Sequence, residues 1–87
     1  MKGTLDEKIL KATKSVLDNL GHKVDYGIFE RLVMKKLVEW GMKPKMAKIH
    51  TKYVPILISN LAPEEVKEQY KRLVNAEMPK PIETYVI

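Results

Sequence analysis

Cysteine is absent from the 87 residues of this sequence. Without it the chain can form no disulfide framework, no thiolate zinc site and no thiol nucleophile. Small secreted domains usually rely on disulfides for stability, so their absence favours the reducing interior of a cell. We therefore expect a cytoplasmic (intracellular) protein.

Other groups that mark enzymes are scarce as well. The two histidines, His22 and His50, lie far apart and have no acidic cluster beside them. A metal site would need several ligands close together. There is no glycine-rich phosphate loop, and neither Ser15 nor Ser59 has a base in a recognisable triad arrangement. We expect no enzymatic activity, no cofactor or metal and no small-molecule substrate.

Long hydrophobic runs are also missing. The longest stretch without a charged side chain lies between Lys52 and Glu64, and Pro55, Asn60 and Pro63 interrupt it. This stretch is too short to cross a bilayer. We therefore expect no membrane partner.

What the sequence does contain is helical periodicity. Hydrophobic residues make up 45% of the chain, which is ordinary for one small globular domain. Their spacing predicts helices over residues 5–20 and 26–40, a third from Pro44 and a last one from Pro63. Residues 56–58 fit either a short buried helix or a strand.

The fold class that follows is all-α, a small four- to five-helix bundle with an extended C-terminal tail. Residues 1–77 form the single helical domain, and residues 78–87 form a proline-containing C-terminal tail or arm. Gly21 is expected to end the first helix in the left-handed conformation, and Gly41 is expected to end the second. Asp25 is expected to cap the second helix with its carboxylate.

Two predicted helices carry the apolar and basic stripes that matter for function. In the helix from Pro44, one stripe is apolar and a second stripe holds lysines at spacings of three and four residues. We expect the apolar stripe to anchor this helix, and the aromatic residues Trp40 and Tyr53 to lie in the core rather than to stack on bases. The expected apolar face of the second helix is Ile28, Phe29, Leu32, Val33, Leu37 and Trp40, and that of the third is Met46, Ile49 and Tyr53.

The positive charge is concentrated in one interval. No acidic residue lies between Glu39 and Glu64, and the four lysines there account for most of the net charge of +5. Lysines placed on a nucleic acid displace condensed counterions, which drives non-specific binding. Lysine is a point charge without the fork geometry of arginine, so we expect contacts with the DNA backbone and little sequence readout. The predicted nucleic-acid-binding residues are Lys43, Lys45, Lys48, His50, Thr51 and Lys52, of which His50 and Thr51 would contact bases or sugars.

The central pair of helices, joined by Gly41-Met42-Lys43, resembles a helix-turn-helix motif. Leu37, Met42 and Ala47 stand where the motif wants apolar or small residues. The resemblance implies duplex DNA binding through the helix from Pro44, which enters the major groove, and it allows a homodimer.

A second interpretation is a helical accessory subunit in a larger protein assembly. The same lysines can face an acidic partner, and any antiparallel pair of helices can turn on a glycine. The arm Thr84, Tyr85, Val86 and Ile87 can add a strand to a partner's sheet, or it can pack on its own domain.

Overall fold

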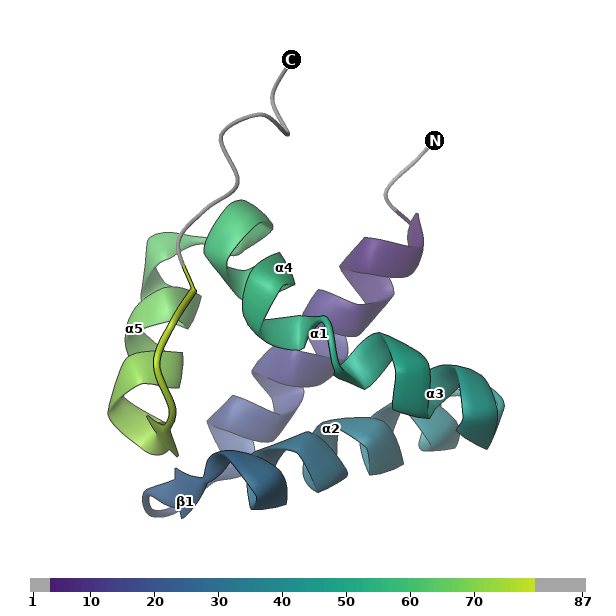
Figure 1. The fold of residues 1–87 in the computed structure, drawn as a ribbon, viewed down its shortest axis with the longest axis horizontal. Coiled ribbons are helices and arrows are strands. Elements are labelled where there is room, and N and C mark those ends of the chain that lie inside the picture. The colour runs from purple at the N-terminus through teal and green to yellow at the C-terminus, as the bar shows by residue number, and fades with distance from the viewer. Residues whose placement is uncertain (1–3, 80–87) are drawn as a thin grey trace.

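The computed structural model describes residues 4–79. Within them the chain forms five helices, so the all-α prediction is confirmed (Figure 1). The predicted arm, Thr84 to Ile87, lies outside the described residues. The helices are α1 (Thr4–Asn19), α2 (Tyr26–Glu39), α3 (Pro44–Thr51), α4 (Val54–Leu61) and α5 (Glu64–Leu73).

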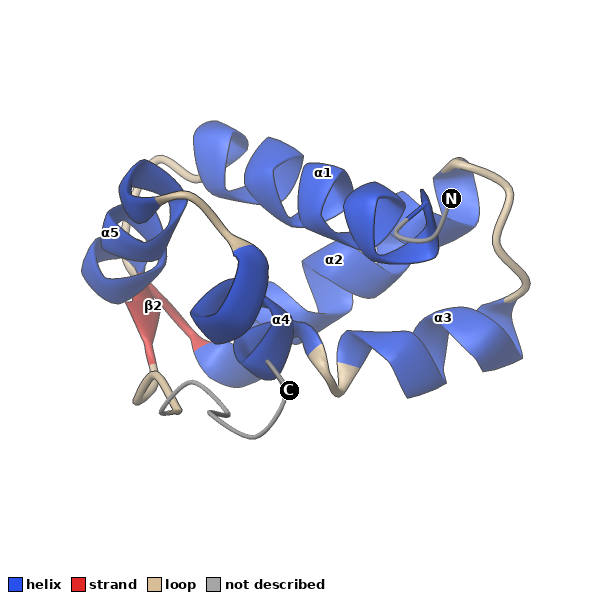
Figure 2. Ribbon diagram, turned by 90° about the horizontal axis from the view of Figure 1, so that it is seen from above, coloured by secondary structure: helices blue, strands red, loops and turns tan. Residues whose placement is uncertain are grey.

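A short pair of parallel strands accompanies the helices. β1 (Val24–Asp25) pairs with β2 (Val74–Asn75), with Val24 opposite Val74. Both valines are buried. The pair ties the connection between α1 and α2 to the segment after α5, at the end of the molecule opposite α3 (Figures 1 and 2). Two residues are too few to show the alternation by which a strand is predicted from sequence.

The core lies where α1, α2, α4 and α5 meet. Tyr70 of α5 is fully buried, and its ring meets that of Phe29 of α2 edge to face, with centroids 5.6 Å apart. Such aromatic pairs favour the edge-to-face geometry because ring faces carry negative and ring edges positive partial charge. The buried hydrophobic residues of the helices are Ile9, Ala12, Val16, Leu17, Phe29, Val33, Leu37, Ala47, Val54, Ile58, Val66 and Tyr70.

The turn between α2 and α3 is built around Gly41. The N–H of Met42 donates to the carbonyl of Leu37, and the N–H of Gly41 donates to the carbonyl of Val38, both at 3.0 Å. This is the Schellman arrangement that ends a helix, and it requires the left-handed φ of 102° that Gly41 adopts. Gly41 is the only described glycine with a positive φ, so the expectation that Gly21 adopts the left-handed conformation is wrong.

Two further local expectations are corrected or resolved. Asp25 occupies the N-cap of α2 with extended backbone angles, but its carboxylate makes no capping hydrogen bond. Residues 56–58 belong to helix α4, which begins at Val54 with Pro55 in its first turn. The missing N–H of Pro55 costs nothing there, because the first N–H groups of a helix have no intrahelical partner.

Candidate nucleic-acid interface

The face that α3 turns to the core differs from the predicted one. Ala47 and Thr51 are buried, and Val54 continues their stripe into α4. The expected anchors Met46, Ile49 and Tyr53 are instead 45%, 49% and 54% exposed. The large apolar stripe of α3 therefore lies on the surface, and the prediction that it anchors the helix is wrong.

The reason is that α3 packs mainly on α2. Small side chains such as that of Ala47 leave room for this packing. A prediction from periodicity alone places the most hydrophobic residues in the core and takes no account of side-chain size. The hydroxyl of Thr51 donates to the carbonyl of Ala47 at 2.6 Å, so its polar group has a partner inside the core. The buried side of α3 can thus hold the small residue Ala47 and the polar residue Thr51, whose hydroxyl has a hydrogen-bond partner within the helix.

Trp40 and Ile28 also depart from the prediction for the second helix. They are 40% and 46% exposed, whereas Phe29, Val33 and Leu37 are fully buried. Trp40 is the C-cap of α2 and lies directly before Gly41. Neither Trp40 nor Tyr53 is a core residue, contrary to our expectation.

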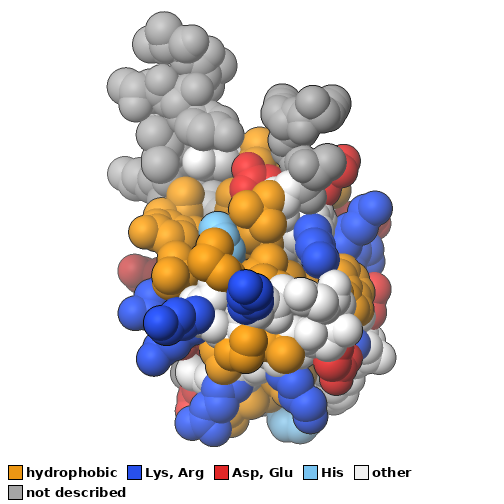
Figure 3. Space-filling model, turned by 90° about the vertical axis from the view of Figure 1, so that its right-hand side faces the viewer, with side chains coloured by type: hydrophobic (Ala, Val, Ile, Leu, Met, Phe, Trp, Pro, Cys, Tyr) orange, Lys and Arg blue, Asp and Glu red, His pale blue; other side chains and the backbone are white. Residues whose placement is uncertain are grey.

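The lysines of this region are exposed. Lys43 precedes α3, and Lys45, Lys48 and Lys52 follow at spacings of three and four residues, which places them on one side of the helix. None of the four forms an ion pair with any residue in 4–79. Figure 3 faces this end of the molecule and shows blue basic side chains next to orange hydrophobic ones over α3.

Ion pairs occur elsewhere on the surface. Lys36 approaches Glu39 at 3.6 Å, and Lys67 approaches Glu64 at 3.6 Å. With the latter pair, α5 compensates part of its own charge. The lysines of α3 differ from these because no carboxylate in the described chain reaches them.

The two predicted base contacts, His50 and Thr51, do not lie with the lysines. Thr51 is only 2% exposed, and its hydroxyl is already bound to the carbonyl of Ala47. The Nε2 atom of His50 is buried, and no hydrogen-bond partner for it is found in residues 4–79. The lysines are therefore the exposed polar groups of this surface, and His50 lines a neighbouring pocket.

That pocket lies between α1, α3 and α4 and has a volume of about 330 Å³. Sequence reasoning missed it, because its walls come from positions 6 to 61 and meet only in the fold. Most of its lining is apolar. The lining residues are Asp6, Ile9, His50, Tyr53, Ile56, Leu57, Asn60 and Leu61.

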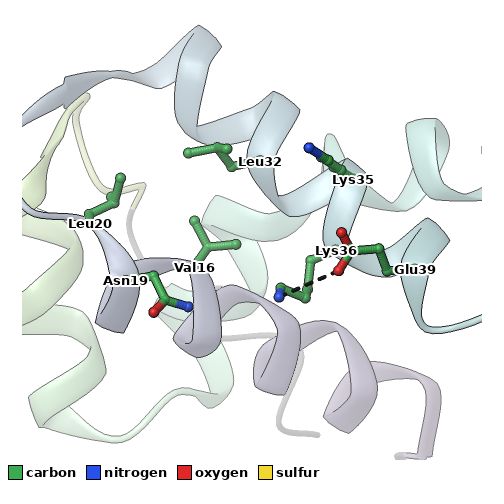
Figure 4. A pocket seen from close by; sticks show the side chains of 7 residues that line it. All are labelled: Val16, Asn19, Leu20, Leu32, Lys35, Lys36 and Glu39. Carbon is green, nitrogen blue, oxygen red and sulfur yellow. Dashed lines mark ion pairs between the residues drawn. The ribbon is translucent and has the colours of Figure 1, made fainter.

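A second cavity of about 250 Å³ lies between α1 and α2 (Figure 4). Val16, Leu20 and Leu32 form its apolar walls. Its polar groups are partly engaged already, since Lys36 pairs with Glu39 and the amide of Asn19 donates to the carbonyl of Ser15 at 2.9 Å. It offers fewer free groups for a ligand than the α3 surface.

Comparison with known protein families, with curated proteins and with solved structures finds no match to this chain. Among the described residues, no helix is both long and apolar enough to span a bilayer. The same residues contain no group of three or more side chains suited to hold a metal ion.

Proposed function

We propose that this protein binds the phosphate backbone of nucleic acid through Lys43, Lys45, Lys48 and Lys52. The observation that carries the proposal is that all four are exposed, gather at α3 and lack an ion pair with any described carboxylate. An exposed ammonium group without a partner can displace the counterions condensed on a phosphate without first breaking an ion pair.

The arrangement of α2 and α3 supports this proposal. Residues 40–43 separate the two helices, and Gly41 sets the turn. A short turn of this kind with a glycine is typical of a helix-turn-helix, whose second helix faces the nucleic acid. Because Thr51 is buried and its hydroxyl is bound to Ala47, the phosphate contacts are made by lysines and carry little sequence preference.

A charge-reversal experiment tests the proposal. The variant Lys45→Glu/Lys48→Glu/Lys52→Glu is compared with the control Lys11→Glu/Lys23→Glu/Lys71→Glu, which changes three exposed lysines outside α3. Each substitution changes the charge by two, so both variants have a net charge of −1 in place of +5. Net charge is thus held equal while the location of the change differs.

Binding is measured by fluorescence anisotropy with a labelled oligonucleotide over a series of salt concentrations. The α3 variant should lose binding, and the control variant should retain most of it. Equal loss in both variants would mean that net charge alone attracts the polyanion, and absence of binding by the wild type at low salt would overturn the proposal.

A protein-binding role is the second candidate, and an apolar groove on α2 favours it. The groove has a volume of about 540 Å³, and Ile28 and Val38 on its walls are 46% and 37% exposed. The simplest partner is a second copy of the chain. Sedimentation velocity should then show a dimer of the 10.1 kDa chain that Ile28→Asp dissociates. A monomer at every concentration would exclude this partner.

A further inference from the structure

We infer that the α3 surface binds single-stranded nucleic acid in preference to duplex, with Tyr53 as the platform on which an unpaired base stacks. This inference rests on the proposed function and specifies its ligand. Contacts with phosphates alone do not explain why the apolar stripe of α3 is exposed.

The two stripes of α3 meet at Ile49. Lys45 and Lys52 lie four residues before it and three after it, and Met46 and Tyr53 lie three before and four after. Residues at these spacings are neighbours on a helix surface, with Cβ atoms about 5–6 Å apart. A basic and an apolar stripe therefore run side by side over the same turns, so that one nucleotide can place its phosphate on one stripe and its base on the other.

Tyr53 is held in a defined position although its side chain is half exposed. Its N–H donates to the carbonyl of His50, and its own carbonyl accepts from the N–H of Leu57, both at 3.0 Å. The residue thus joins the end of α3 to the start of α4 through a hydrogen bond on each side. A fixed backbone under an exposed ring reduces the conformational entropy lost when a base stacks on it.

The pocket beside Tyr53 extends the platform into a recess. Tyr53, Ile56 and Leu61 contribute apolar walls, and all three side chains are partly exposed. The volume of about 330 Å³ lies at the lower end of the range found for ligand pockets. A single planar base is a ligand of suitable size and shape for such a recess.

His50 supplies an independent observation that points to a ligand. Its Nε2 is buried and lacks a hydrogen-bond partner among the described residues, and the residue lines the same pocket. Buried polar atoms in proteins normally have a partner. The edge of a base carries donors and acceptors, so a base in the pocket can satisfy this nitrogen once the imidazole ring turns toward it.

A duplex makes poorer use of this surface than a single strand. Its bases are stacked on one another and present only their edges, which leaves the ring of Tyr53 and the side chains of Met46 and Ile49 against water or phosphate. The unpaired bases of a single strand offer their faces for stacking, and lysines bind its backbone in the same way. The apolar stripe therefore selects for unpaired bases.

The test compares three labelled probes of equal length and phosphate number at one salt concentration. They are an oligothymidylate single strand, a hairpin duplex and a single strand of abasic sites, which keeps the phosphates and lacks the bases. We expect the wild type to bind the oligothymidylate at least about fivefold more tightly than the other two, since stacking of one base contributes about 1–3 kcal/mol.

Substitution of Tyr53 assigns the preference to the ring. Tyr53→Ala should weaken oligothymidylate binding by about 5- to 150-fold, the same stacking energy expressed as a ratio of dissociation constants, and should leave abasic binding unchanged. Tyr53→Phe should retain the preference. Leu5→Ala, which truncates a similarly exposed apolar side chain on α1, should have no effect.

The outcomes separate this inference from the proposed function. Equal binding of all three probes, lost only in the α3 charge-reversal variant, would overturn the stacking role and leave the phosphate interface in place. No binding of any probe would overturn both. If an amphipathic helical peptide of glutamate and leucine then binds and Tyr53→Ala abolishes that binding, the surface is an interface for an acidic protein partner.

Discussion

At the scale of single residues, the ring and the hydroxyl of Tyr70 are expected to contribute differently to the stability of the fold. The residue is fully buried against Phe29, and its hydroxyl has no hydrogen-bond partner among the described residues. Burial raises the pKa of the Tyr70 phenol. For Tyr26, which also packs on Phe29, burial together with the charge of Glu30 raises the pKa to about 12. Both phenols therefore stay neutral at physiological pH.

Removal of the Tyr70 hydroxyl should consequently cost nothing. We expect Tyr70→Phe to leave the free energy of unfolding unchanged or to raise it by about 1 kcal/mol, because a buried polar group without a partner pays for its desolvation. Tyr70→Ala should lower it by about 3–5 kcal/mol through loss of the buried ring. Urea unfolding followed by circular dichroism measures both. A large loss of stability in Tyr70→Phe would show that the hydroxyl has a partner after all.

Asp18 connects α1 to α5 through an exposed hydrogen bond. Its carboxylate accepts from Nε2 of Gln69 at 2.7 Å and from Nζ of Lys14 at 3.1 Å. These bonds, that from Gln69 foremost, hold the pKa of Asp18 below its ordinary value of 3.8. Because the pKa is lowered, the ionised Asp18 carboxylate stabilises the folded state. This contribution to the free energy of unfolding is fully present above pH 3.8 and is lost as the pH falls through the lowered pKa.

Titration of the Asp18 carboxyl carbon by NMR checks this account. The midpoint should lie below 3.8 in the wild type, and it should rise more in Gln69→Ala than in Lys14→Ala. The ordering follows from the larger effect of the neutral but short hydrogen bond across the two helices. A wild-type midpoint at or above 3.8, or no response to Gln69→Ala, would contradict it.

At the scale of elements, the turn at Gly41 determines how α3 leaves α2. A side chain at a φ of 102° is strained whatever space surrounds it, and we expect Gly41→Ala to lower the free energy of unfolding by about 1–2 kcal/mol. Gly21→Ala is the matched control. Its φ is not positive and a Cβ there meets no atom within 4 Å, so stability should stay constant or rise by up to about 1 kcal/mol.

Thermal unfolding of the two glycine variants is the measurement. Equal melting temperatures would mean that the turn tolerates another conformation. If Gly41→Ala also weakens nucleic-acid binding, the turn positions the lysines of α3 as well as stabilising the fold.

The sequence predicts where the helices begin and end better than it predicts which side of each helix is buried. The ends of α1 and α2 fall within a residue or two of the predicted ones, because periodicity and glycine mark them. The rotation of α3 escapes prediction, since Ala47 and Thr51 are less hydrophobic than Ile49 and Tyr53 and yet lie buried. Close packing on α2 decides this face, and it is a property of the pair of helices rather than of α3.

At the scale of the whole molecule, the sequence predicts the lysines of the candidate site but not the pocket beside them. Lys45, Lys48 and Lys52 are foreseen as an exposed stripe because they follow one another at helical spacing and lack nearby acidic residues. The pocket of His50 and Tyr53 cannot be foreseen, since its walls come from three helices that are separate in the chain. Local spacing thus predicts where charge gathers, whereas tertiary packing decides which apolar groups accompany it.

The distribution of charge also sets the salt dependence of the whole protein. If all four lysines neutralise phosphates, the logarithm of the binding constant should fall with the logarithm of salt concentration with a slope of about −2.8 on a single strand and about −3.6 on a duplex. The slope reports the number of displaced counterions and does not depend on which bases stack. It therefore tests the phosphate interface separately from the role of Tyr53.

Measurement of this slope for the wild type and for Lys45→Glu/Lys48→Glu/Lys52→Glu is the most direct test of the central claim. We predict a slope of about −3 for the wild type and loss of binding in the variant, with the slope preserved in Lys11→Glu/Lys23→Glu/Lys71→Glu. A wild-type slope near zero, or the same loss in both triple variants, would contradict the assignment of α3 as the surface that binds phosphates.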